Sequence, residues 1–575
     1  MKLNKIICGT LGVLALASCS DEMNYKEYNI YDKDYISSTF SNVGGFMTDI
    51  YNAIDYDYGS YGGATLGCAT DEAEYSHPGT SAIEDLYNGA WSPTNAKEST
   101  WNNMYKAINT CNQVMEKFSD LEFKDYQYNS DYSEQMARYK NYKWEARFWR
   151  AYFYFNLAKR YGGVPLVTKL QSANVTNQME RASADSTFKF IIDECIAVED
   201  NIVKDAKDFN LPNEIDDGRA NRLTVLALKA RAALYWASPL FNPTGDKERY
   251  HKAALYTKQL IDEAEAKGMG LTAKYEDLWS VKNYSDVKIT KEIIFGRRIY
   301  GSGSNGSSNT FETRCYPVGI EGGQGGTCPS YNLVEAYEMK NGLGINEAGS
   351  GYDAANPYKD RDPRLEATIA KNGDVWPSYQ KNKLEIFAGG VNGEPLQNAT
   401  PTGFYLKKLL HGSINLGSSS KYKTDNHTWV TFRMGEFYLN YAEAVFKYLG
   451  SADATSAEFP MSASQAASKT RLRVGMPAFN AGMSNDAFWA KYTNERFVEL
   501  AFEDHRFWDV RRWKEAPKYF TSIKELKLTK EADGTISSKV KTVSRNWDDK
   551  MYLFPIPQND ILKNHNLTQN PGWDK

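Results

Sequence analysis

The strongest constraint on the fold of this 575-residue chain is a series of amphipathic segments that end at helix-stopping residues. From Tyr142, the segment YKWEARFWRAYFYFNLAKRYGG carries apolar residues at steps of three and four and ends at Gly162 and Gly163. This spacing places apolar side chains on one face of an α-helix, and glycine commonly ends one. A second segment from Asn221 follows the same plan and ends before Pro239. The pattern predicts a mainly α-helical protein.

Further segments of this kind predict that the helices pack in antiparallel pairs. Residues 250–268 and 432–450 repeat the pattern, and small residues such as Ala230 and Ala233 allow helix backbones to approach closely. Helix pairs that bury their apolar faces only against their neighbours form a tetratricopeptide-like array. The usual signature residues of that repeat are absent, so the prediction rests on the pattern of pairs.

Long stretches rich in glycine and aromatic residues separate the predicted helices. They span residues 55–95, 270–350 and 370–425. Loops of this length in a compact domain usually carry function. We therefore expect a helical scaffold whose long irregular loops bear the ligand site.

The N-terminus has the form of an export signal. An apolar run from Ile6 to Ala17 follows two lysines and is too short to span a membrane as a helix. Residues 1–18 are therefore predicted to be a signal peptide. Leu16-Ala17-Ser18-Cys19 resembles a bacterial lipobox, which predicts acylation of Cys19 and a lipidated tether over residues 19–40.

Composition narrows the possible partners. The net charge is −4, with 68 basic and 72 acidic residues, so no long-range attraction to nucleic acid is expected. Cys315 and Cys328 lie in a glycine-rich stretch and form a candidate disulfide in an exported chain. No CxxC motif or pair of histidines has metal-ligand spacing, so no metal site is predicted.

Taken together, the motifs resemble the SusD/RagB family of outer-membrane nutrient-binding lipoproteins over nearly the whole chain. The matching stretches are W101–N112, EARFWRAYFYFNLAKRYGGVPL, RANRLTVLALKARAALY, PSYNLVEAYEMKNG, RDPRL, FRMGEFYLNYAEA, NERFVELAFEDHRFWDVRRW and LFPIPQNDILKNHNLTQNPGW. The resemblance implies one α-helical domain over residues 41–575 with four tetratricopeptide-like helix pairs. It also implies a lipoprotein that binds glycans without cleaving them and acts as a lid on a SusC-like TonB-dependent transporter.

The resemblance also bears on location. Ser20-Asp21-Glu22, next to the predicted lipid site, resembles the acidic tag that directs Bacteroidetes lipoproteins to the cell exterior. We therefore expect a protein held in the outer membrane by its lipid and facing outward. No cofactor is predicted, and the sequence does not decide whether a structural calcium ion is bound.

The charged segment 496–513, RFVELAFEDHRFWDVRRW, contains the acidic and basic residues that would be candidates for catalysis if the protein were an enzyme. On one continuous helix, Glu495, Glu499 and Glu503 share a face, with Arg506 three residues further on. Glu503 and His505 then point to different sides and cannot act on one bond. Buried acids require basic partners. We therefore expect a scaffold helix with paired charges, and no catalytic residues.

Glycan recognition needs flat aromatic faces and short polar groups held on loops. The segment 54–80 offers Asp55, Asp57, Asp71, Tyr75 and His77 as glycan-binding candidates. In the starch-binding members that the chain resembles, a T-D-E-like turn precedes aromatic residues that stack on the ligand. Thr70-Asp71-Glu72 matches that turn, but Tyr75 and His77 stand where such members carry Trp, which argues against starch.

Two other loops add candidates. Phe311 lies near the base of the loop that contains Cys315 and Cys328, and Trp376 and Tyr379 flank a proline in the segment DVWPSYQ. A Trp in a proline-containing turn without helical periodicity is more often on the surface than in the core. These three residues complete the predicted glycan site.

Two alternative functions remain open at this stage. A cell-surface glycoside hydrolase would need two carboxylates facing each other across a cleft, and nothing in the sequence fixes such a pair. A helical-repeat adaptor would bind proteins on a concave face. The adaptor overlaps with the lid function, since a lid also contacts a protein partner.

Overall fold

The computed structural model describes residues 33–96, 100–205, 218–279, 291–299, 311–418, 420 and 425–574. The predicted signal peptide, Cys19 and most of the predicted tether lie outside these residues.

The described chain is mainly helical, as predicted. Its α-helices are α2 (Lys33–Ser37), α3 (Phe40–Asn52), α4 (Asp85–Asn88), α5 (Thr100–Lys117), α6 (Tyr132–Tyr161), α7 (Ala173–Thr176), α8 (Ala184–Glu199), α9 (Arg222–Ala237), α10 (Lys247–Ala266), α12 (Phe311–Cys315), α13 (Tyr331–Ala336), α14 (Pro363–Thr368), α15 (Met434–Leu449), α16 (Ala463–Arg473), α17 (Asn485–Glu499), α18 (Arg506–Arg512), α19 (Ala516–Tyr519) and α20 (Gln558–Lys563). Short 3₁₀ turns connect several of them.

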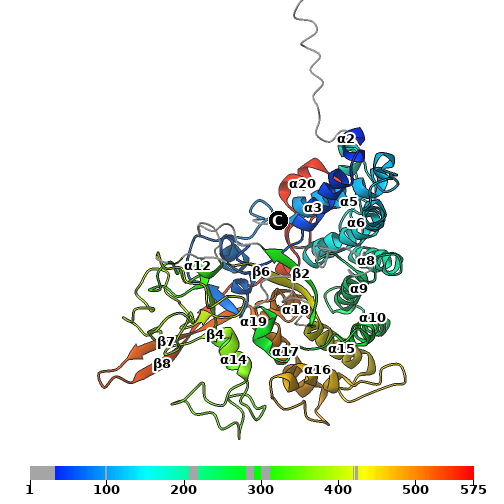
Figure 1. Cartoon of the computed structure of the whole chain (residues 1–575). Helices are drawn as coiled ribbons and strands as arrows, with labels where there is room; N and C mark the ends of the chain where they lie inside the picture. The colour runs from blue at the N-terminus through cyan, green and yellow to red at the C-terminus, as the bar shows by residue number, and fades with distance from the viewer. Residues whose placement is uncertain are drawn as a thin grey trace, which may run out of the picture.

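The long helices form a tetratricopeptide-like array, which confirms the predicted fold class. Each helix packs on the next in the order α5, α6, α8, α9, α10, α15 and α16, and α16 also contacts α17. Figure 1 shows this array as a curved column along one side of the molecule. The predicted alanines allow the close packing, because Ala227, Ala230 and Ala233 of α9 are completely buried.

Local sequence signals account for the helix ends. Asn221 and Thr224 form a capping box at the start of α9, and Ser462 and Gln465 form another before α16. Gly450 adopts a left-handed conformation just after α15, where a residue with a side chain would be strained. One boundary differs from expectation, since α6 begins ten residues before the predicted start at Tyr142.

Within the described residues, the strands form four separate antiparallel pairs opposite or beside the helical array. These are β1 (Ala73–Tyr75) with β3 (Thr327–Pro329), β2 (Ile293–Ile299) with β6 (His427–Arg433), β4 (Ile369–Ala370) with β5 (Tyr405–Leu406), and β7 (Ser522–Lys530) with β8 (Ile536–Ser544). In Figure 1 the β7–β8 hairpin projects from the body on the side away from the array. The β2–β6 pair lies between the array and the loops. It shows that the stretch 270–350 is not purely irregular.

The prediction of one continuous helix over the charged segment 496–513 is wrong. Helix α17 ends at Glu499, Phe502 and Asp504 have φ angles of 60° and 61°, and α18 begins at Arg506. At this helix end, groups from distant segments bind the carbonyl oxygen of Glu499, which has no partner within the helix. Arg433 Nη2 donates to the Glu499 oxygen at 3.0 Å, and the Tyr275 hydroxyl donates to the same oxygen at 2.7 Å.

The prediction that this segment is scaffold holds for most of its charged residues. Arg512 pairs with Glu443, Arg496 pairs with Asp509 at 2.6 Å, and Arg506 pairs with Asp71 at 2.7 Å, all of them buried. The break after Glu499 has a further consequence, because it turns the loop containing Asp504 toward the centre of the molecule.

Candidate functional site

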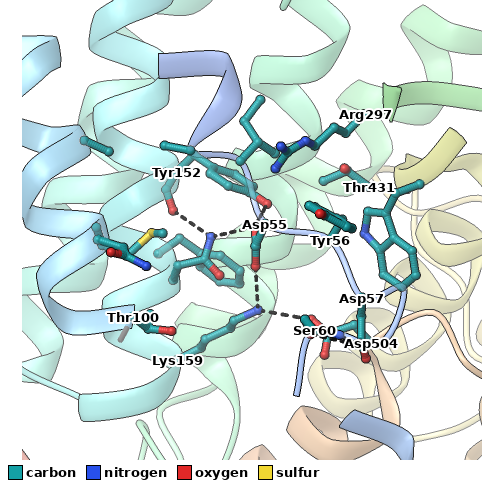
Figure 2. A pocket seen from close by; sticks show the side chains of 18 of the residues that line it. Asp55, Tyr56, Asp57, Ser60, Thr100, Tyr152, Lys159, Arg297, Thr431 and Asp504 are labelled. Atoms are coloured by element: carbon teal, nitrogen blue, oxygen red, sulfur yellow. Dashed lines mark hydrogen bonds and ion pairs between the residues drawn. The ribbon is translucent and has the colours of Figure 1, made fainter. Parts of the chain in front are cut away.

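A central cavity of about 900 Å³ lies where the helical array meets the loops. The loop after α3 crosses it, α5, α6 and α9 form one wall, and β2, β6 and residues 503–505 form the other. Figure 2 shows this cavity, with Asp55 and Tyr56 of the loop between the two walls. A volume of this size fits a small ligand such as a short oligosaccharide.

Charged groups form one side of the cavity. Lys159 Nζ of α6 lies 4.0 Å from Asp55 Oδ2 and 3.5 Å from Asp504 Oδ2 (Figure 2). The Tyr152 hydroxyl donates to Asp55 Oδ1, and the Asn156 amide lies 3.4 Å from the same oxygen. Burial opposes ionisation of Asp55, but the positive charges of Lys159 and Arg160 outweigh it and lower the pKa of Asp55.

Asp57 has the opposite electrostatic character. Burial, and then the negative charge of Asp504, raise the pKa of Asp57 from 3.8 to about 7. Its two oxygens accept hydrogen bonds from the Leu66 backbone N–H at 2.6 Å and the Ser60 hydroxyl at 2.8 Å. The side chain is 7% exposed. Asp57 therefore holds the loop in place more than it faces the cavity.

An aromatic side chain, Tyr56, and a cationic one, Arg297, lie beside each other in the cavity (Figure 2). The Tyr56 ring is 37% exposed, and the Arg297 guanidinium carbon lies 4.5 Å from its centroid. Arg297 of β2 pairs in the sheet with Trp429 of β6, and both residues line the cavity. Tyr56 was not among the predicted site residues, although it stands between the predicted Asp55 and Asp57. The only feature of the sequence that points to Tyr56 as a site residue is the alternation of Asp and Tyr in IDYDY.

The structure does not bring the eight predicted glycan-binding residues together. Asp55 and Asp57 line the central cavity. Tyr75 and His77 stack on each other behind it, with ring centroids 5.1 Å apart, and the Tyr75 hydroxyl donates to the oxygen of Gly62 at the cavity edge. The two groups are thus separated by the turn around Gly62.

Asp71 and Phe311 are corrections to the predicted site, because both are buried. Asp71 is 4% exposed, and its carboxylate accepts hydrogen bonds from Arg506 at 2.9 and 2.7 Å. A paired carboxylate inside the protein holds the T-D-E turn to α18. Phe311 is 3% exposed and packs edge-on against Tyr58, with centroids 4.8 Å apart.

Trp376 and Tyr379 form a third, separate group. Both are partly buried and pack around Tyr316, with centroid distances of 6.1 and 6.4 Å. Within the described chain, the Trp376 indole N–H and the Tyr379 hydroxyl have no hydrogen-bond partner. They remain predicted ligand contacts, on a surface that does not line the central cavity.

The predicted disulfide between Cys315 and Cys328 is not formed, because both residues are separate buried thiols. Cys328 lies in β3, where neighbouring side chains point to opposite faces. Thr327 points toward Cys68 at 3.6 Å, whereas the Cys328 thiol lies 3.5 Å from the oxygen of Gly326. The β1–β3 pairing thus fixes the segment without a covalent link. Burial raises the pKa of Cys315 to about 12, so it is a thiol at neutral pH.

The described residues contain neither a metal-binding cluster nor a helix able to span a membrane. They contain no group of three or more His, Cys, Asp or Glu side chains arranged to hold a metal ion. In the same part of the chain, none of the helices is both long enough and apolar enough to cross a membrane. The features that are present define a helical-repeat protein with a ligand-sized cavity beside its array.

Comparison with known proteins assigns the chain more closely. A family model described as "SusD family" matches residues 291–573, and one described as "Starch-binding associating with outer membrane" matches residues 32–234. The SusD-like protein P2 of Formosa agariphila is 23% identical over 98% of both chains. The chain belongs to the SusD family.

Solved structures show the same fold. A SusD-like protein from Bacteroides fragilis superimposes with a TM-score of 0.74 and 24% identity, covering 94% of this chain and 99% of that one. A SusD-like carbohydrate-binding protein from the same species gives a TM-score of 0.70 and 21% identity, covering 93% and 100%. The family models confirm the predicted family, and the solved structures show that its fold extends over nearly the whole chain.

Proposed function

We propose that this protein binds an oligosaccharide or a polysaccharide segment in the central cavity, without cleaving it. The observation that carries the proposal is the exposed Tyr56 side chain in a cavity of about 900 Å³ that Asp55, Lys159 and Asp504 also line. An aromatic face packs against the C–H face of a sugar ring, and polar groups bond its hydroxyls. Membership in the SusD family and the carbohydrate-binding relative support the same function.

We further propose that the protein acts at the outer membrane and delivers the glycan to a SusC-like TonB-dependent transporter. Acylation of Cys19 would anchor the chain and leave residues 41–575 as one domain facing the cell exterior. The family description that includes association with the outer membrane supports this location. His77, Trp376 and Tyr379 stay predictions for additional contacts to the glycan or the transporter.

Substitution of Tyr56 tests glycan binding. Tyr56→Ala removes the aromatic face, so we expect the affinity for any retained polysaccharide to fall about two- to tenfold, the loss of roughly 0.5–1.5 kcal/mol typical of an aromatic pair. Affinity gel electrophoresis and calorimetry against plant, fungal and host glycans measure it. Tyr128→Ala is the matched control, because Tyr128 is 91% exposed and distant in sequence from the cavity segments. Equal affinity of Tyr56→Ala and wild type would remove the cavity from the site.

One observation favours a second candidate function, a glycoside hydrolase. Asp57, with a pKa of about 7, and Asp55, with a lowered pKa, line the same cavity, as an acid and an ionised carboxylate would. However, both oxygens of Asp57 already accept hydrogen bonds from the loop. Release of reducing ends from a bound polysaccharide, lost in Asp57→Asn, would favour the hydrolase over a binding protein.

A further inference from the structure

Arg297 differs from the other buried or half-buried arginines around the central cavity. Among the described residues, the two other arginines that line the cavity bind oxygen atoms: Arg231 pairs with Glu436 at 2.5 Å, and Arg160 donates to the backbone and side-chain oxygens of Asn156 at 3.2 Å. Arg297 makes no ion pair or hydrogen bond with any described side chain, and its guanidinium carbon lies 4.5 Å from the centroid of the Tyr56 ring. Figure 2 shows Arg297 and Tyr56 beside each other in the cavity, opposite Lys159.

The acidic groups of the cavity do not supply the missing partner. Asp55 attracts Arg297 through its charge, but its oxygens already interact with Tyr152, Asn156 and Lys159. Asp504 lies against Lys159 and accepts a hydrogen bond from the Trp508 indole at 3.1 Å. These two carboxylates are thus engaged by other groups of the protein, and Glu503, which also lines the cavity, pairs with Arg433 at 2.6 Å.

A guanidinium that is partly removed from water and has no anionic partner is costly. Burial lowers the pKa of Arg297, although a guanidinium remains charged in proteins. Its planar donors match the two oxygens of a carboxylate or a sulfate, and stacking on an aromatic ring fixes the orientation of that plane. Tyr56 provides such a ring, so the donors are oriented before any ligand arrives.

We propose that Arg297 and Tyr56 form a subsite for an anionic substituent, so that the preferred ligand is an acidic glycan bearing carboxylate or sulfate groups. This inference rests on the proposed glycan binding and adds the class of ligand. In this arrangement Arg297 binds the anionic group while Tyr56 contacts the ring that carries it.

The test compares acidic polysaccharides with their neutral forms. The probes are polygalacturonate and alginate, each beside its carboxyl-reduced form, and carrageenan, which carries sulfate but no carboxylate, beside its desulfated form. We expect wild type to be retained by at least one acidic probe and at least tenfold more weakly by its neutral form. The carboxylate and sulfate probes distinguish the two possible anionic groups.

Three variants assign the preference to Arg297. Arg297→Gln should lose at least tenfold in affinity for the acidic probe and bind it like the neutral one. Arg297→Lys keeps the charge but not the planar donors, so its affinity should fall between those of wild type and Arg297→Gln. Arg298→Gln is the matched control, because Arg298 is the next residue of β2 and does not line the cavity. It should bind as wild type does.

The outcomes separate this inference from the proposed function. Retention by neutral glycans alone, or unchanged acidic binding in both Arg297 variants, would overturn the anionic subsite and leave glycan binding intact. Retention of wild type by no glycan, acidic or neutral, would overturn both. Melting temperatures of the variants, followed by circular dichroism, show that a loss of retention reflects the side chain and not unfolding.

Discussion

At the scale of single residues, burial of Asp57 makes the stability of the fold depend on pH. Its pKa of about 7 in the folded chain exceeds the ordinary value of 3.8, so the folded state holds the proton more tightly than the unfolded state. The contribution of protonated Asp57 to the free energy of unfolding is fully present below about pH 4 and is lost as the pH rises to about 7. Burial also raises the pKa of Glu72 to about 8, which acts in the same direction at higher pH.

Asp57→Asn should therefore flatten this dependence. Each pKa unit corresponds to about 1.4 kcal/mol, so between pH 5 and pH 8 the variant should lose about 2 kcal/mol less stability than wild type. Urea denaturation at the two pH values measures the difference. The exposed Asp486→Asn serves as a control that should follow wild type. Parallel pH profiles for wild type and Asp57→Asn would contradict the assigned burial of this carboxyl.

At the scale of elements, buried charges join the end of α17 to other segments. The Glu499 carboxylate receives hydrogen bonds from Arg364, Arg433 and Arg473 at 2.5–2.9 Å and is completely buried. These cations outweigh the effect of burial and hold the pKa of Glu499 well below its usual value. The cluster connects α14, β6 and α16 to α17.

Glu499→Ala leaves three buried arginines without this partner, so we expect the free energy of unfolding to fall by about 3–5 kcal/mol. Chemical denaturation measures the loss. The control is Lys518→Ala, which breaks an exposed pair with Glu515 and should cost under about 1 kcal/mol. If Glu499→Ala were no worse than Lys518→Ala, the cluster would contribute little to the fold.

At the scale of the whole molecule, noncovalent contacts between distant segments hold the long loops. The turn at residues 70–72 is bound by Arg506 through Asp71, by the Phe502 N–H through Glu72, and by Arg545 through the Thr70 oxygen at 2.5 Å. These partners lie more than 400 residues further along the chain. The loops therefore depend on the C-terminal part of the chain for their position.

Because no disulfide adds to these contacts in the described chain, reductant should not change the melting temperature. A chain that begins after Cys19, denatured without reductant, should show five titratable thiols: Cys68, Cys111, Cys195, Cys315 and Cys328. A disulfide between Cys315 and Cys328 would leave three thiols and make the melting temperature sensitive to dithiothreitol. Ellman titration and a thermal scan distinguish the two cases.

The helical array was predictable because its information is local. Periodic apolar residues, capping residues such as Asn221 and stop signals such as Gly162 act within a few turns of chain. The candidate site was predictable only in part. Asp55 lines the cavity, whereas Asp71 and Phe311 are buried, and no local pattern distinguishes a paired carboxylate from a solvated one.

The sequence by itself determined the fold class, the helix pairs and the family, because these follow from short-range periodicity and from motifs in a fixed order. Only the tertiary structure decided which side chains share the cavity. Lys159, Arg297 and Asp504 come from three distant segments. At the break between α17 and α18, Arg433 and Tyr275 bind the Glu499 oxygen, and both residues come from distant segments of the chain. Burial and charge pairing are properties of the packed chain, so the sequence alone could not predict the chemistry of the site.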